Sequence, residues 1–215
     1  MAGGPPKMKR CFLTRHAWPD NPGNIAYGDQ ISIDFGHPDL DSKLDAVFDL
    51  LPPAAPVSFF ASPATRCIET LEYGLDLRGL PKNYVTAPGL LEQRWGTWTN
   101  VPRYRISRSE LATYLRDPDN NAPPQGESMH TQRKRVLPAF QHAVVEDGTA
   151  DIHMGVIHGG SMRAVLSHIM GQPMSAILAN KTLKIDPLDV LELEIPASVK
   201  DERFYHEIKW TLHKP

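Results

Sequence analysis

The sequence predicts an α/β fold in which a mainly parallel sheet is covered by helices on both faces. Short apolar runs alternate with longer segments of helical periodicity, which is the pattern of successive strand–helix units. Runs such as VSFFAS are apolar throughout, which is typical of strands buried on both faces. Of the 215 residues, 41% are hydrophobic and 22% are charged, an ordinary composition for a globular protein with a sizeable core.

Six apolar runs predict the strands of this sheet. The first, KRCFLT, stops abruptly at Arg15-His16. The last two are separated by the polar turn PASVKDER, so we expect them to form an antiparallel pair at one edge. The predicted strands cover residues 9–14, 57–62, 84–86, 152–157, 188–195 and 204–213.

Helices are predicted between these strands. Apolar residues recur at helical spacing over residues 40–51, until Pro52 ends the pattern. Pro63 begins the next helix, at a position where its missing N–H costs nothing. The stretch 18–38 is rich in Pro, Gly, Asn and Asp and predicts a long loop. Further helices are predicted over residues 107–115, 127–145, 161–170 and 174–180.

Length and charge limit the class of protein. The chain fits one domain, residues 8–215, preceded by a disordered leader over residues 1–7. A net charge of −2 argues against nucleic-acid binding. No run is long enough for a signal peptide or a membrane span, so a cytoplasmic protein without a membrane partner is expected. Cys11 and Cys67 lie in apolar contexts and are expected to be buried, reduced thiols.

Polar clusters follow three of the predicted strands. In parallel sheets ligands bind beyond the carboxyl ends of the strands, so these clusters are expected to meet on one rim. A single histidine at a strand end is more often packed or solvated than catalytic. Three clusters at equivalent positions favour a shared site. They are Arg15-His16, Ser62-Pro63 with Arg66, and His158-Gly159-Gly160, with Arg163 in support.

These side chains suit phosphoryl transfer. Arginine guanidinium groups bind phosphate oxygens in pairs and stay charged at any working pH. A neutral imidazole is a competent nucleophile, and its phosphorylation divides hydrolysis into two easier steps. His158 would donate hydrogen bonds to the phosphoryl oxygens, and the amides of Gly159 and Gly160 at a helix start would add donors. A carboxylic acid must then supply a proton to the leaving oxygen.

Five segments resemble, in order and spacing, the signatures of the histidine phosphatase superfamily, and more narrowly its phosphoglycerate-mutase-like branch. The resemblance implies that His16 is the phosphorylated nucleophile and that Arg15, Arg66 and His158 complete the phosphate pocket. It implies that Glu92 is the general acid that later activates water. It also implies a three-layer αβα sandwich with a small helical lid over about residues 95–130. No metal or cofactor is expected, because arginines and histidines take the place of a cation as charge stabilisers. The segments are FLTRHA (12–17), SPATRCIET (62–70), LLEQRWGTW (90–98), PPQGES (123–128) and VIHGGSMR (156–163).

The chain departs from the family pattern beside the first histidine. Ala17-Trp18 replace the usual glycine and polar residue, and Pro22 stands where an asparagine often contacts the phosphate. The roles of Trp18, Asn21 and Asn24 are therefore open. Glu92 follows two leucines and precedes Trp-Gly-Thr-Trp, so we expect a partly apolar setting that keeps it protonated at neutral pH.

The substrate is predicted only as a small-molecule phosphate ester. The loop IAYG (25–28) and the segment 98–128 resemble those of α-ribazole-phosphate phosphatases of cobalamin synthesis, and a broad-specificity phosphatase is an equal alternative. Several arginines of the lid are expected to draw in anions. They are Arg94, Arg103, Arg105 and Arg108.

Other functions are less compatible with the residues. No His-Glu-x-x-His or Asp-rich metal motif occurs, and His153 is expected to point outward from its strand. Mutase activity fits the fold, but the chain is shorter than typical mutases and its lid differs. Acid phosphatases and phytases carry other residues after the second histidine. A catalytically silent scaffold would lack the nucleophile or a phosphate-binding residue, and all are present. The oligomeric state is open, a homodimer included.

Overall fold

The computed structural model describes residues 8–21, 25–53 and 55–215. A six-stranded sheet forms the centre of this part of the chain. The expected leader over residues 1–7 lies outside these residues. The strands of this sheet are β1 (Lys9–Arg15), β3 (Val57–Ala61), β4 (Tyr84–Thr86), β6 (Ile152–Ile157), β7 (Val190–Ile195) and β8 (Lys209–His213).

The strand order is β4-β3-β6-β1-β7-β8. The first four strands in this order run parallel to their neighbours, whereas β7 is antiparallel to β1 and β8 is antiparallel to β7. The predicted mainly parallel sheet with an antiparallel edge is therefore confirmed.

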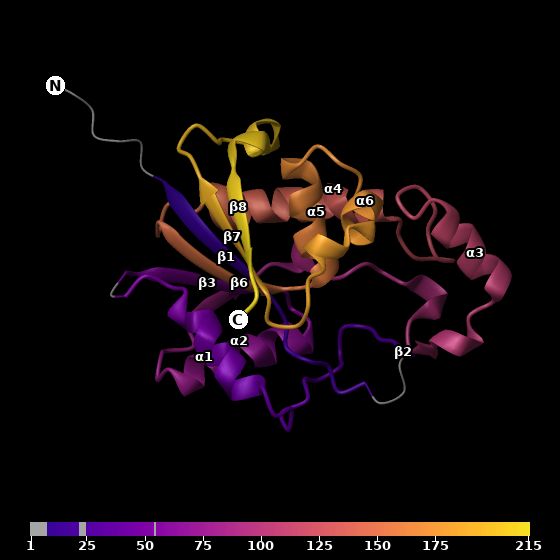
Figure 1. The fold of residues 1–215 in the computed structure, drawn as a ribbon, viewed down its shortest axis with the longest axis horizontal. Coiled ribbons are helices and arrows are strands. Elements are labelled where there is room, and N and C mark those ends of the chain that lie inside the picture. Colours follow the sequence, from indigo (N-terminus) through magenta and orange to yellow (C-terminus); the bar gives the residue numbers. More distant parts are fainter. Residues whose placement is uncertain (1–7, 22–24, 54) are drawn as a thin grey trace.

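Helices cover both faces of the sheet, as the alternating pattern predicts. The helices α1 (Leu40–Asp49) and α2 (Thr65–Leu77) lie on one face, and α4 (Met129–Phe140) and α5 (Gly159–Ile169) lie on the other (Figure 1). A π-helical turn continues α4 to Val145, and α6 (Met174–Ala179) follows α5. No helix within the described residues has both the length and the apolar character needed to cross a membrane.

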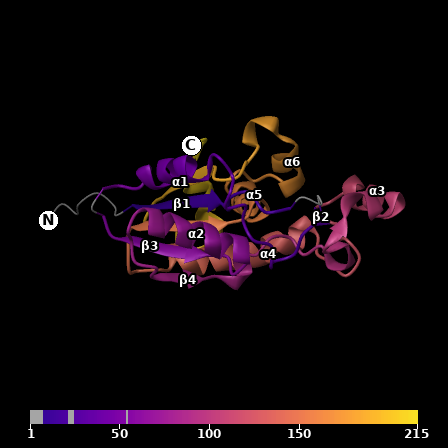
Figure 2. The same cartoon turned by 90° about the horizontal axis from the view of Figure 1, so that it is seen from below.

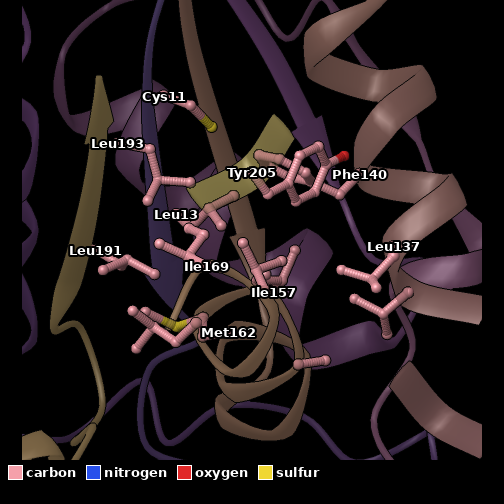
Figure 3. Packing of buried hydrophobic residues seen from close by; sticks show 14 of the residues in the cluster. Cys11, Leu13, Leu137, Phe140, Ile157, Met162, Ile169, Leu191, Leu193 and Tyr205 are labelled. Atoms are coloured by element: carbon pink, nitrogen blue, oxygen red, sulfur yellow. The ribbon is translucent and has the colours of Figure 1, made fainter. Parts of the chain in front are cut away.

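Two hydrophobic cores explain why the central strands lack a polar face. On β1, Cys11 and Leu13 belong to the core under α4 and α5, whereas Phe12 belongs to the core under α1 and α2. Figure 3 shows the first of these cores between the sheet and its helices. Successive side chains of a strand point to opposite faces, so both faces must be apolar here. The predicted burial of Cys11 and Cys67 is confirmed, and burial raises the pKa of both thiols.

The segment 95–130, which we call the lid segment, projects at one end of the molecule. It carries the short helix α3 (Arg108–Arg116) and the two-residue strand β5 (Val101–Pro102). β5 pairs with β2 (Ile25–Ala26), which lies in the stretch predicted as a loop. Both views place α3 and β2 beyond α4 at that end (Figures 1 and 2). This pairing ties the chain that follows His16 to the lid segment.

The C-terminal strands are shorter than predicted. Residues Glu202–Glu207 form a 3₁₀ helix, so the predicted strand 204–213 begins only at Lys209. Tyr205 is fully buried, with its ring packed edge-on against Phe140. β7 begins at Val190 because Leu188 adopts a φ of 64°, which is incompatible with an extended strand.

Candidate active site

The carboxyl ends of β1, β3 and β6 bring the three predicted clusters together. His16 follows β1, and its backbone N–H donates to the carbonyl of Ile157 at the end of β6 (2.9 Å). His158 is the next residue, and its ring centroid lies 5.3 Å from that of His16. Arg66, in the first turn of α2, reaches His158 with an Nη2–Nδ1 distance of 3.0 Å. The convergence predicted from strand ends is present in the structure.

The structure fixes the tautomer and the charge of the His16 ring. Its Nδ1 lies 2.7 Å from the carbonyl oxygen of Ala17, which only accepts hydrogen bonds, so Nδ1 carries the proton and Nε2 keeps its lone pair. The side chain is almost fully buried. Burial lowers the pKa of His16 well below its usual value, and the nearby His158, Arg66 and Arg15 lower this pKa further. The imidazole is therefore neutral at physiological pH.

His158 uses both ring nitrogens within the protein. Its Nδ1 faces Arg66 Nη2, which only donates, so Nδ1 accepts and Nε2–H donates to Ser62 Oγ at 2.8 Å. Burial, followed by the positive charge of Arg66, lowers the pKa of His158 well below its usual value. A hydrogen bond from His158 to a phosphoryl oxygen requires this N–H to leave Ser62. The position of Ser62 at a strand end predicted that it lies near His158, but not that the two side chains share a hydrogen bond.

The guanidinium groups of Arg15 and Arg66 are anchored at one end and unpaired at the other. Arg66 is 1% exposed, donates to the carbonyl of Gly28 (2.8 Å) and lies over the ring of Tyr27 (4.8 Å from its centroid). Arg15 donates to the carbonyl of Ile185 (2.8 Å). The Nε atom of each arginine is buried and has no hydrogen-bond partner among the described residues. Unpaired buried donors are costly, so these N–H groups mark both arginines as candidate anion ligands.

Gly159 lies between two cations at the start of α5. A Cβ atom on Gly159 would lie 3.4 Å from Arg163 Nη1 and 3.6 Å from Arg15 Nε. As the first residue of the helix, Gly159 has an N–H without a partner in the helix. Burial lowers the pKa of Arg163, while the Glu92 carboxylate opposes this shift. The first turn of α5 and these guanidinium groups together form a strongly anion-attracting corner.

Glu92 is held as an ionised carboxylate. Oε1 accepts from the backbone N–H of Gln93 (2.9 Å) and from Gln132 Nε2 (3.0 Å), and Oε2 accepts from the backbone N–H of Gly160 (3.1 Å). Burial raises its pKa, but these hydrogen bonds and the Arg163 charge outweigh burial, and the net shift is downward. The prediction that Glu92 is protonated at neutral pH is therefore wrong, because donors distant in sequence surround it.

A partly buried ion pair holds the segment that carries Glu92. Arg135 of α4 donates to the carbonyls of Gly89, Leu91 and Glu92 at 2.7–2.9 Å. Its Nε lies 3.1 Å from Oε2 of Glu127, a side chain only 4% exposed. Neither Arg135 nor Gln132 was identified from the sequence. Residues three apart in a helix lie on the same face, so the predicted helix 127–145 could have indicated that Gln132 and Arg135 act on the same neighbouring segment.

The residues whose roles were open lie in the loop after His16. Trp18 stacks on His37, with ring centroids 3.6 Å apart. Asn21 exchanges two hydrogen bonds of 3.1 Å with the backbone of Ile25. Asn24 lies outside the described residues.

His153 does not point outward as predicted. It is fully buried because β6 is covered on both faces; its Nε2 lies 3.1 Å from the carbonyl of Ala150, and its Nδ1 lies 3.6 Å from Asp147. Within the described ranges, no group of three or more His, Cys, Asp or Glu residues is placed to hold a metal ion.

Comparison with known families agrees with this geometry. A family model described as the histidine phosphatase superfamily (branch 1) matches residues 41–201. The chain belongs to the histidine phosphatase superfamily. The matched range includes Arg66, Glu92 and His158, whereas Arg15 and His16 precede it.

Solved structures share the histidine phosphatase fold over nearly the whole chain. Mycobacterial hydrolase 1 has a TM-score of 0.74 and 18% identity, covering 96% of this chain and 97% of that one. A mycobacterial glucosyl-3-phosphoglycerate phosphatase has a TM-score of 0.71 and 20% identity, covering 95% and 97%. An Escherichia coli protein described as a candidate alpha-ribazole-5'-P phosphatase has a TM-score of 0.69 and 19% identity, covering 95% and 94%. No curated protein matches the sequence significantly. At these identities the likeness establishes the fold alone.

Proposed function

We propose that this histidine phosphatase hydrolyses small-molecule phosphate monoesters through a phosphohistidine at His16. One observation carries the proposal: a buried, neutral imidazole with a free Nε2 lies beside two arginines whose buried Nε donors are unpaired. A phosphoryl group bound to these donors would bring its phosphorus within reach of His16. Family membership supports the same reaction class.

In the first step the lone pair on Nε2 of His16 forms the N–P bond while the P–O bond to the alcohol breaks. The guanidinium groups of Arg15 and Arg66 stabilise the charge on the phosphoryl oxygens in the transition state. The proton stays on Nδ1, which donates to the carbonyl oxygen of Ala17, and this hydrogen bond fixes the ring orientation throughout. The product is a phosphoramidate on a buried side chain.

Glu92 supplies and then removes a proton. Because its pKa is lowered, it must first take up a proton, which a substrate monoanion carries near its second pKa of about 6. Protonated Glu92 gives this proton to the leaving alcohol oxygen. The carboxylate then takes a proton from water as that water attacks phosphorus. The N–P bond breaks and neutral His16 is restored.

We propose that neither a metal ion nor another cofactor is needed. Metal-dependent phosphatases use the cation to neutralise phosphoryl charge and to activate water. Here the guanidinium groups of Arg15, Arg66 and Arg163 provide positive charge, and Glu92 provides the base. Side chains of the protein therefore supply both the charge neutralisation and the activation of water that a metal ion supplies in metal-dependent phosphatases.

The substrate that we put forward is α-ribazole 5′-phosphate. It rests on the resemblance of the loop 25–28 and of the lid segment to the phosphatases that use it, and the Escherichia coli protein of similar fold is described in the same terms. Broad specificity for small phosphate esters is the alternative. A phosphoglycerate mutase-type transfer would pass the phosphoryl group to a second hydroxyl instead of water.

A phosphatase assay over a panel of phosphorylated metabolites, including α-ribazole 5′-phosphate and 3-phosphoglycerate, tests the function. Release of inorganic phosphate, unchanged after exhaustive chelation with EDTA, is the expected result. A strong preference for one ester identifies the substrate, and comparable rates over many esters indicate broad specificity. Isomerised ester without phosphate release would reveal a mutase. No turnover of any ester, with His16 unphosphorylated, would identify a silent scaffold and overturn the proposal.

A further inference from the structure

An apolar cavity of about 380 Å³ lies between the lid segment and the body of the protein. Its size is within the range of small-molecule binding sites. Arg103 is the one charged residue in its lining and lies on an exposed turn. The cavity is framed by Ala26, Trp95, Trp98, Tyr114, Met129 and Leu178.

Three aromatic rings form one wall of the cavity. The ring centroids of Trp95, Trp98 and Tyr114 lie 5.7–6.5 Å from one another, and the Tyr114 ring meets both indoles edge-on. Two polar groups of this wall have partners: Trp98 Nε1–H points to Glu110 (3.4 Å) and the Tyr114 hydroxyl donates to Gln93 (3.1 Å). The wall is therefore a fixed apolar surface that suits a flat ring.

Exposed leucines lie at the opening of the cavity. Leu115 of α3 is 61% exposed and Leu178 of α6 is 49% exposed, although both line the cavity. Large apolar side chains that border a concave apolar surface are typical of a ligand site. A ligand that filled the cavity would remove both leucines from water and gain from their burial.

Two walls of the cavity are formed by chain segments that also carry, a few residues away, side chains of the phosphate site. Trp95 stands three residues after Glu92, so their Cα atoms are at most about 11 Å apart. Tyr114 is joined to Glu92 through Gln93, which accepts from the Tyr114 hydroxyl and donates its backbone N–H to the carboxylate. On the opposite wall, Ala26 precedes Tyr27, the residue whose ring supports Arg66. The cavity lining is therefore linked, through directly adjoining residues, to Glu92 on one side and to Arg66 on the other.

We propose that this cavity binds the alcohol portion of the substrate and selects phosphate monoesters that carry a flat, apolar ring system. The inference rests on the proposed function for the phosphate end and adds a recognition element for the other end. The aromatic wall favours a ring over a flexible chain, and Arg103 at the rim can cover its outer face by a cation–π contact. The ester must be long enough for its ring to reach this wall while its phosphoryl group lies beside His16.

Two primary alkyl phosphates with similar leaving groups test this preference. We expect kcat/KM for 2-(2-naphthyl)ethyl phosphate to exceed that for propyl phosphate by at least about tenfold, since burial of about 55 Å² of apolar surface corresponds to that factor. The paired substitution Leu115→Gln with Leu178→Gln should reduce this ratio severalfold. As a matched control, Leu77→Gln changes an exposed leucine at the end of α2 and should leave the ratio unaltered.

A binding measurement separates this inference from the proposed reaction. Titration calorimetry with 2-(2-naphthyl)ethanol, which has no phosphate, should show saturable binding that the paired leucine substitution weakens severalfold. Turnover of propyl phosphate without a naphthyl preference would overturn the ring-binding role and leave the phosphatase intact. The ring-binding role would also be overturned if the alcohol showed no saturable binding, or if the paired leucine substitution left its affinity unchanged. If neither ester were hydrolysed while the alcohol still bound, the result would instead contradict the proposed phosphatase activity.

Discussion

The carboxylate of Glu92 accepts a hydrogen bond from the backbone N–H of Gly160, with an Oε2–N distance of 3.1 Å. This contact joins the segment before the lid to the first turn of α5, one residue beyond Gly159. It depends on the absence of a side chain, because a Cβ atom at Gly160 would lie 1.9 Å from Glu92 Oε1 and 2.8 Å from Gln132 Nε2. Gly160 therefore fixes where Glu92 can lie.

The substitution Gly160→Ala should displace the Glu92 carboxylate without disturbing the helix, since alanine favours helical backbone. We expect kcat/KM for an alkyl phosphate to fall by roughly 10²-fold or more, the scale of lost general acid catalysis. Circular dichroism checks that the fold is retained. Gly159→Ala is the matched control: its nearest new contact is 3.4 Å, so its loss should be markedly smaller. Equal losses in both variants would contradict the steric argument.

The substitution Glu92→Gln tests proton transfer directly. If Glu92 protonates the leaving oxygen, kcat/KM for alkyl phosphates should fall by roughly 10²–10⁴-fold. The loss should be much smaller for p-nitrophenyl phosphate, whose leaving group departs without a proton. We specify kcat/KM because it reports the phosphorylation step, whereas kcat also contains the later water attack. Equal losses with both substrates, and an unchanged pH profile, would show that Glu92 binds or supports rather than transfers a proton.

Gln132 is a positioning residue that holds Glu92 in its ionised form. Leucine at this buried position removes the 3.0 Å hydrogen bond to Oε1, so the pKa of Glu92 should rise. Because the Glu92 carboxylate must be ionised to take the proton from the substrate monoanion, the rising acid limb of kcat/KM for alkyl phosphates should move to higher pH in Gln132→Leu. A rate loss with an unmoved limb would mean that Gln132 acts only on packing.

Buried neutral histidines predict acid lability in a defined pH window. The pKa values of His16, His153 and His158 are lower in the folded protein than the unfolded value of about 6.5, so below that pH the unfolded chain binds protons that the folded chain does not. The free energy of unfolding should therefore decrease as pH falls below about 6.5, by at most about 1.4 kcal/mol per pH unit for each histidine. Carboxylates with lowered pKa values, such as Glu92, contribute only below about pH 4.5.

Urea unfolding at about pH 7.5, 6.5 and 5.5 measures this dependence. Replacement of His153 by glutamine should reduce the slope below about pH 6.5 and leave the contribution of the two site histidines. A stability that stays constant between about pH 7.5 and 5.5 would show that these histidines are not held neutral in the folded state.

The sequence predicted the residues at strand ends but not their electrostatic setting. His16, Arg66 and His158 could be assigned to one rim because parallel strands end at the same edge of a sheet. The state of Glu92 could not, because Leu90 and Leu91 suggested an apolar wall while its donors come from Gly160 and Gln132, which are 68 and 40 residues away along the chain.

His153 and the segment before Lys209 depart from the sequence prediction for a related reason. His153 was expected outward because strands usually alternate, but β6 is a central strand with a core on each face. The residues before Lys209 have the composition of a strand and instead form a 3₁₀ helix whose start is capped by the side chain of Asp201. In each case tertiary packing, which local pattern does not contain, decided the outcome.

The most direct test of the account is covalent labelling of His16. Brief incubation with a ³²P-labelled alkyl phosphate, followed by quenching, should leave label on the wild-type protein that survives alkali and is lost in acid, as expected for a phosphoramidate. The substitution His16→Ala should abolish this label, whereas His37→Ala, at a histidine outside the site, should retain it. Label with the opposite stability, or label that persists in His16→Ala, would contradict a phosphohistidine at His16.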